Sequence, residues 1–147
     1  MTDKTPAELF LSDYRETFER FDVAAVAAFF AFPLQVTGDA AEVTVVSVPT
    51  LEAWLPQIER IVGAYQMLGV ASADARGARV VSVTSRISQA TVNWHLLDAD
   101  GAVVYDFHAS YTLADLGAGL RITAIAHDES PRLMAALARR QATSRTA

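Results

Sequence analysis

The segment VVYDFHAS, residues 103–110, places an acid and a base inside an apolar stretch. Asp106 and His108 are separated by one residue, and the aromatic residues Tyr105 and Phe107 alternate with them. Alternate side chains of a β-strand point to opposite faces, so Asp106 and His108 share one face and the aromatic pair shares the other. A carboxylate and an imidazole on one face could hold a metal ion or pass a proton.

Other polar residues are predicted beside this pair. In the register that we expect, Asp106 lies between Asn93 and His127 on the neighbouring strands, and His95 is a diagonal neighbour. One interpretation is a metal or proton site built from Asp106, His108 and His127. The other is a polar sheet surface facing solvent or a second subunit, which we favour because an open sheet face does not exclude water. We therefore assign no metal and no cofactor.

Apolar alternation predicts the strands that position these residues, at 78–84, 89–97, 102–113 and 119–127. The loop DADG at 98–101 pairs Leu97 with Ala102 and Trp94 with Tyr105, which keeps apolar residues opposite one another. By the same rule Tyr111 lies opposite Ile122. The predicted inner face comprises Val81, Val83, Val92, Trp94, Leu96, Tyr105, Phe107, Tyr111, Leu113, Leu120 and Ile122.

Helices are predicted before and after these strands. Their starts are marked by capping residues at Thr5, Asp22, Thr50 and Ser130. Pro33 ends the second helix, which carries Phe29 and Phe30, and Gly69 ends the third. Residues 34–48 indicate two strands joined by a Gly-Asp turn.

Composition limits the functions open to the chain. Its 147 residues suffice for one domain, 1–147, with a core over 6–129 and a C-terminal helix and tail over 130–147. The net charge of −5 gives no attraction to nucleic acid, and no apolar run reaches the roughly 18 residues of a membrane span. There is no cysteine for a disulfide or thiolate, and MTDKTPAELF lacks the apolar stretch of a signal peptide. We expect a cytoplasmic protein that binds neither nucleic acid nor membrane.

Three segments in this order are similar to those of a known superfamily: DVAAVAAFFAFP, VNWHLLDADG and GLRITAIAHDE. Over nearly the whole chain they resemble the nuclear transport factor 2-like superfamily, which includes ketosteroid isomerases and SnoaL-like polyketide cyclases. The resemblance is closest to its uncharacterised bacterial members. It implies an α+β fold in which a curved antiparallel sheet wraps three helices into a cone, with a C-terminal helix added. It also implies an apolar pocket in the open end of the cone.

The resemblance also implies site residues. Tyr14 matches the tyrosine with which ketosteroid isomerases donate a hydrogen bond to the substrate oxyanion. Gly38 occupies the position of the general base, with Asp39 next to it, and Tyr111 falls near the second acid. The catalytic candidates are thus Tyr14, Asp39 and Tyr111. The ligand-binding candidates, each of which could also be a core residue, are Phe18, Phe30, Trp54, Ile58, Tyr65, Trp94 and Phe107.

Two functions stay open. One is a small enzyme that isomerises, cyclises or hydrates an apolar, carbonyl-bearing metabolite, with Asp39 as base and tyrosines as donors. The other is a non-catalytic ligand-binding or scaffolding protein. In both cases we expect a homodimer through the outer sheet face, where we place Val80, Val104 and Ile125.

Overall fold

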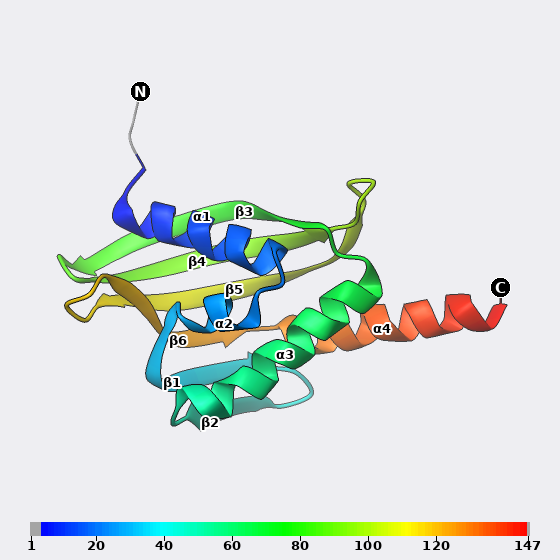
Figure 1. Cartoon of the computed structure of the whole chain (residues 1–147), viewed down its shortest axis with the longest axis horizontal. Helices are drawn as coiled ribbons and strands as arrows, with labels where there is room; N and C mark the ends of the chain where they lie inside the picture. Colours follow the sequence, from blue (N-terminus) through cyan, green and yellow to red (C-terminus); the bar gives the residue numbers. More distant parts are fainter. Residues whose placement is uncertain (1–3, 147) are drawn as a thin grey trace.

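A computed structural model describes the backbone of residues 4–146 and the side chains through residue 143 (Figure 1). Residues 1–3 and 147 of the predicted domain lie outside this range. The helices are α1 (Pro6–Glu19), α2 (Val23–Ala27), α3 (Leu51–Leu68) and α4 (Glu129–Thr146). The strands are β1 (Phe30–Asp39), β2 (Val43–Val48), β3 (Ser72–Thr84), β4 (Ile87–Leu97), β5 (Val103–Asp115) and β6 (Leu120–His127).

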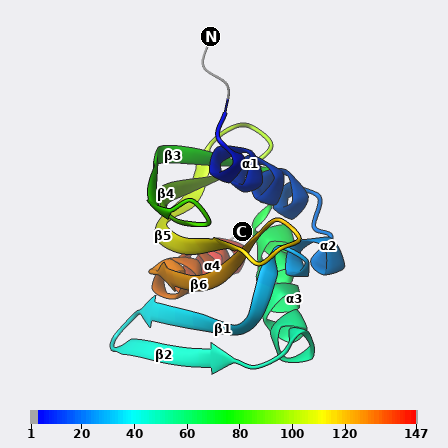
Figure 2. The same ribbon diagram turned by 90° about the vertical axis from the view of Figure 1, so that its left-hand side faces the viewer.

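The strands form one curved sheet in the order β2-β1-β6-β5-β4-β3. It curves around α1, α2 and α3 (Figure 2), which is the α+β fold that the resemblance implied. The strands β3 to β6 pair antiparallel as predicted. The sheet is not wholly antiparallel, however, because β1 runs parallel to β6. These two strands are far apart in the chain, and a long connection allows parallel neighbours.

The faces of β4 and β5 agree with the prediction, although their register does not. Trp94 is buried opposite Phe107, where we expected Tyr105. The loop leaves Leu97 opposite Val103, one residue further than expected, and a bulge adds one more. A shift of two residues returns each side chain to the same face. The inner and outer sets of these two strands are therefore preserved.

The predicted pairing of β3 with β4 was wrong by an odd number of residues, which places the side chains of β3 on the opposite faces from those expected. Val81 and Val83 were expected inside, but both are exposed. Val80 lies opposite the buried Ala90 and packs against the core. The turn between β3 and β4 is tight and a further register shift interrupts the strand, so the alternation of β3 is reversed relative to the expected one.

A bulge in β6 changes the face of its last residues. Leu113 lies opposite Ile122, yet Tyr111 lies opposite Ile125, so one extra residue of β6 stands between the two pairs. Both isoleucines consequently face inward, which corrects the outer position expected for Ile125. The same shift turns His127 inward. Two of the three apolar residues assigned to the outer face, Val80 and Ile125, are thus inner residues.

The first three helix starts agree with the capping signals at Thr5, Asp22 and Thr50. The Thr5 hydroxyl accepts the backbone N–H of Glu8 at 3.2 Å, and similar caps start α2 and α3. Two helix boundaries differ from the prediction, the end of α2 and the start of α4. Helix α2 stops at Ala27, so Phe30 begins β1, and α4 begins at Glu129 rather than Ser130. None of the helices in the described range is long and apolar enough to cross a membrane.

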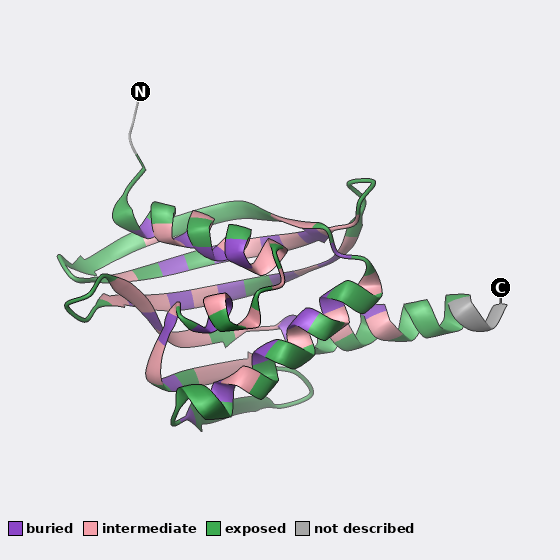
Figure 3. Ribbon diagram, in the orientation of Figure 1, coloured by how far each residue is buried: buried purple, intermediate pink, exposed green. Residues whose placement is uncertain are grey.

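The core lies between the helices and the inner sheet face. Buried residues gather on β4, β5, α1 and α3 (Figure 3). The largest fully buried side chains are Leu34, Ile58, Leu113, Ile122, Val26 and Val92.

Candidate functional site

An apolar cavity of about 100 Å³ lies between α1, α3 and the inner sheet face. Every residue that the sequence nominated for the site, except Asp39, lines it: Tyr14, Tyr111, Phe18, Phe30, Trp54, Ile58, Tyr65, Trp94 and Phe107. The Phe30 ring meets the rings of Trp54 and Tyr14 edge to face, with centroids 5.3 and 5.9 Å away. Such packing makes these residues core and cavity wall at once.

Asp39 lies away from the cavity. It ends β1 and is exposed. Leu34, Val36 and Gly38 share the inner face of the strand, so the alternation turns Asp39 to the other side. A Cβ atom placed on Gly38 would lie 3.8 Å from Nε2 of His127, which itself lines the cavity. The structure therefore does not bring Asp39 together with the two candidate tyrosines.

A different carboxylate enters the cavity, from the first residue of α4. Glu129 is buried, and its Oε2 accepts hydrogen bonds from the hydroxyls of Tyr65 on α3 and Tyr105 on β5. The Tyr105 bond measures 2.8 Å. Among the described residues, Oε1 of Glu129 has no hydrogen-bond partner. One oxygen is thus held by two donors while the other is available.

Burial sets the proton affinity of this group. It raises the pKa of Glu129 above that of an exposed glutamate, although the two tyrosine bonds act in the opposite direction. Burial and the nearby carboxylate also raise the pKa values of Tyr65 and Tyr105 well above their usual value. The tyrosines therefore stay protonated and donate to Glu129 near neutral pH.

Hydrogen-bond donors line the same cavity. The hydroxyl of Tyr111 accepts a bond from Nε1 of Trp94 at 2.8 Å, and the ring of Tyr14 meets that of Tyr111 edge to face, with centroids 5.9 Å apart. Since the indole N–H can only donate, the O–H of Tyr111 remains free to donate to a further acceptor. Nε1 of Trp54 is buried and has no partner among the described residues. Tyr111 and Trp54 can thus each offer a proton to an oxygen in the cavity.

His127 contributes a neutral imidazole to the wall. Its Nδ1 accepts the backbone N–H of Glu129 at 3.1 Å, which places the ring proton on Nε2. Burial lowers the pKa of His127, so the ring is uncharged near neutral pH. Because it faces inward, it does not join Asp106 and His108, and no three described His, Asp or Glu side chains are placed to hold a metal ion.

Asp106 and His108 have structural partners on the outer side of β5. Asp106 accepts from Nδ2 of Asn93 at 3.2 Å and lies 3.3 Å from Nη1 of Arg132 on α4. The Asn93 bond lowers the pKa of Asp106, and Arg132 acts in the same direction. Nδ1 of His108 lies 3.1 Å from Oδ2 of Asp128. These contacts join the start of α4 to the sheet.

The sequence did not identify Glu129 or Tyr105 as site residues, and it placed His127 on the outer face beside Asp106 and His108 rather than in the cavity. One signal was available, because two inward tyrosines, Tyr65 and Tyr105, both need a buried hydrogen-bond partner. The partner could not be named, since the helix was expected to begin after Glu129. The inward turn of His127 depends on the bulge in β6.

Comparisons with known proteins agree with this architecture. The family model of the NTF2-like protein (DUF6841) matches residues 3–130. Among curated proteins, none matches the chain.

Solved structures share the fold at low sequence identity. An NTF-2 like protein of unknown function from Shewanella oneidensis is 10% identical with a TM-score of 0.66, covering 84% of this chain and 96% of its own. An NTF2-like protein with a cystatin-like fold from Novosphingobium aromaticivorans is 15% identical with a TM-score of 0.63, covering 87% and 84%. A candidate ketosteroid isomerase from Shewanella frigidimarina is 14% identical with a TM-score of 0.63, covering 85% and 96%.

The family model spans most of the chain, and the curved sheet around three helices is the fold of these structures. This chain belongs to the NTF2-like family DUF6841.

Proposed function

We propose that the cavity binds a small, largely apolar molecule with a carbonyl group, and that Glu129 transfers a proton at the carbon next to that carbonyl. One observation carries the proposal. A buried carboxylate has one oxygen fixed by Tyr65 and Tyr105 while its other oxygen has no partner, in a cavity that also holds free donors. Tightly positioned acids and bases of this kind are typical of sites for proton transfer.

The chemistry needs no further component. Oε1 of Glu129 takes the proton, the electron pair of the C–H bond forms a C=C bond, and the carbonyl oxygen gains the negative charge. The O–H of Tyr111 and the N–H of Trp54 would stabilise that charge, because fixed donors act strongly where water is excluded. Return of the proton to another carbon gives an isomer, and return to the same carbon gives exchange.

Cavity size supports a small reacting group. The volume of about 100 Å³ is below the roughly 300–1,000 Å³ of pockets that enclose drug-sized ligands. The aromatic wall favours an apolar ring or chain over a sugar or nucleotide. The fold similarity to a candidate ketosteroid isomerase is consistent with this class of chemistry.

The test is hydrogen exchange at the carbons beside the carbonyl of cyclohexanone in D2O, followed by proton NMR. We expect exchange with the wild-type protein and a loss in Glu129→Gln of about 10²- to 10⁴-fold, the range of general-base catalysis. Glu59→Gln, at an exposed site on α3, is the matched control. Equal exchange by wild type and Glu129→Gln would overturn the proton-transfer proposal. Binding without exchange would support the alternative, a ligand-binding protein.

A further inference from the structure

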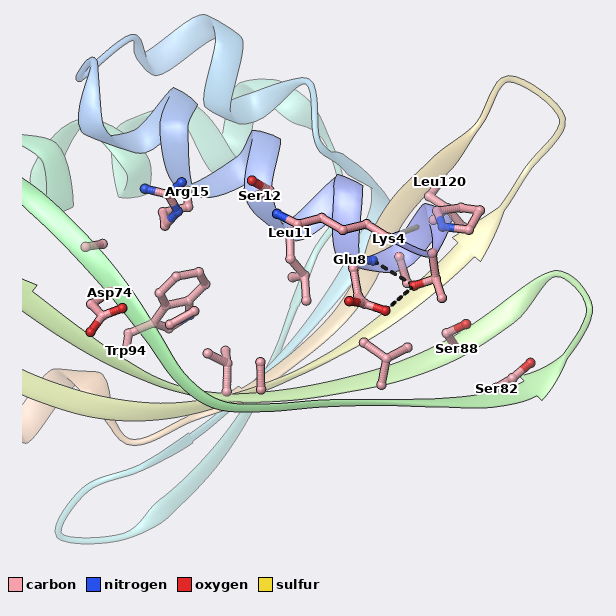
Figure 4. A pocket seen from close by; sticks show the side chains of 18 of the residues that line it. Lys4, Glu8, Leu11, Ser12, Arg15, Asp74, Ser82, Ser88, Trp94 and Leu120 are labelled. Carbon is pink, nitrogen blue, oxygen red and sulfur yellow. Dashed lines mark hydrogen bonds between the residues drawn. The ribbon is translucent and has the colours of Figure 1, made fainter. Parts of the chain in front are cut away.

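A second, larger hollow of about 820 Å³ lies between α1 and the β3–β4 hairpin (Figure 4). We call it the α1 groove. Small side chains leave this space open beneath the helix: Ala73, Ala75, Ala78, Ser82, Ser85 and Ser88. Apolar side chains on both sides, such as Leu11 and Val92, complete its walls.

The α1 groove adjoins the cavity. Ala73 and Trp94 line both hollows, so the two spaces meet at these residues. At this place the backbone N–H of Ala73 on β3 donates to Oε2 of Glu19 on α1 at 2.8 Å, which joins the helix to the strand. Figure 4 shows Trp94 toward one end of the groove and Ser82 and Ser88 toward the other. A strand rises about 3.3 Å per residue, so the span from Ser88 to Trp94 is about 20 Å.

Charges in the α1 groove favour an anion. Asp74 lies 2.9 Å from Nε of Arg76, and Arg15 lies 3.2 Å from Glu19, so these two charges are paired. Glu8 accepts from the hydroxyl of Thr5 at 3.0 Å and keeps its negative charge. Lys4 and Arg86 also line the groove, and neither forms an ion pair with a described residue. Two unpaired cations against the one carboxylate of Glu8 leave the groove with a net positive charge.

We propose that the α1 groove and the cavity form one binding site for an extended amphipathic anion. An apolar chain lies along the groove, its carboxylate or similar group meets Lys4 and Arg86, and its other end passes Trp94 into the cavity. This inference rests on the proposed function, because it names the class of molecule whose uncharged end Glu129 meets. It also explains how a cavity of about 100 Å³ could serve a longer ligand.

The probes are straight-chain alkanoates. Trp54 and Trp94 are the only two tryptophans of the chain, and Trp94 lines both hollows while Trp54 lines the cavity, so their fluorescence reports binding along the joined site. We expect affinity to rise from hexanoate to decanoate and to fall for the uncharged methyl decanoate. Arg86→Glu and Lys4→Glu should each weaken decanoate binding by about three- to ten-fold, because each reverses a charge next to the anion.

Matched variants separate binding in the groove from the effects of a changed net charge or a larger side chain elsewhere. Arg79→Glu changes the net charge equally but lies outside both hollows, and it should leave decanoate binding unchanged. Ala78→Phe fills the groove and should weaken decanoate binding, whereas Thr91→Phe on the exposed side of β4 should not.

Equal binding of hexanoate and decanoate, or equal effects of Arg86→Glu and Arg79→Glu, would overturn the groove inference. Cyclohexanone exchange needs only the cavity, so it would still test Glu129 by itself.

Discussion

Glu129 is the residue whose environment most strongly favours a function. Burial of a carboxylate penalises its charged form, and the hydroxyls of Tyr65 and Tyr105 offset only part of that penalty. A lone structural carboxylate would be better satisfied with both oxygens bonded. The free Oε1 is instead the feature on which we base the proposal that Glu129 exchanges protons with a bound molecule.

The raised pKa of Glu129 predicts how stability varies with pH. The folded protein holds this proton more tightly than the unfolded chain, whose glutamate titrates near pH 4.5. The contribution is therefore fully present below that value and is lost as pH rises through the folded-state pKa. Compared with Glu129→Gln, the wild-type free energy of unfolding should fall as pH rises from 4 to 8 in urea titrations. Parallel pH curves for these two proteins, with Glu59→Gln as control, would contradict the assigned shift.

Removing the hydroxyl of Tyr111 should lower the free energy of unfolding more than removing the hydroxyl of Tyr14. In Tyr111→Phe, the N–H of Trp94 loses its acceptor, which costs about 1–3 kcal/mol for an unsatisfied buried group. In Tyr14→Phe, Tyr111 keeps its bond from Trp94, so the loss should be about 1 kcal/mol or less. Thermal unfolding measures the difference.

The loss of ligand affinity should also be larger in Tyr111→Phe than in Tyr14→Phe. Tyr111 has the free O–H and should lose more affinity for cyclohexanone than Tyr14, as calorimetry can show. Equal losses in the two phenylalanine variants would place the anchoring role on Tyr14 as well.

Helix α4 matters because it carries Glu129 and is tied to the sheet by Arg132. This guanidinium lies 3.3 Å from carboxylate oxygens of both Asp106 and Asp128. All three groups are partly exposed, so solvent screens the pairs and their contribution to stability is small.

Arg132→Met should loosen α4 without unfolding the rest. We expect faster amide hydrogen exchange in residues 129–143 and unchanged protection in β4 and β5, since local openings follow local contacts. Arg140→Met, on an exposed position of the same helix, is the control. An unchanged exchange rate in α4 would show that its apolar contacts alone hold it.

At the scale of helices and strands, features set by neighbouring residues could be predicted from the sequence, and features set by pairing between distant strands could not. The starts at Thr5, Asp22 and Thr50 depend on nearby residues, and the alternation around Trp94 keeps its face under a two-residue shift. The bulge that turns Ile125 inward arises from pairing between strands, which no local pattern specifies. The cavity wall was therefore predictable. Its carboxylate was not, because Glu129 enters through the docking of α4.

At the scale of the molecule, exposed aliphatic residues bear on assembly. Val81 and Val83 on β3 and Val43 and Val45 on β2 are each more than half exposed, on the outer face of the edge strands. We still predict a homodimer through that face, now with these valines in place of Val80 and Ile125.

Sedimentation velocity tests the dimer. We expect a dimer at about 10 µM, a concentration typical of specific interfaces with micromolar or tighter affinity, and a shift toward monomer in Val81→Lys/Val83→Lys. Leu116→Lys, at an exposed turn, should leave the dimer intact. A wild-type monomer at that concentration would contradict the prediction.

The contact between Tyr65 and Glu129 joins residues 64 positions apart in the chain. Closing so long a segment costs conformational entropy before the contact returns any energy, and non-local contacts of this kind slow folding. Helices and hairpins can therefore form in a partly folded chain that still lacks the carboxylate held by two tyrosines. Ligand binding would then begin only when α3, β5 and α4 have assembled. A binding assay on this protein would also be a folding assay, and variants selected for binding would be selected for a completed fold.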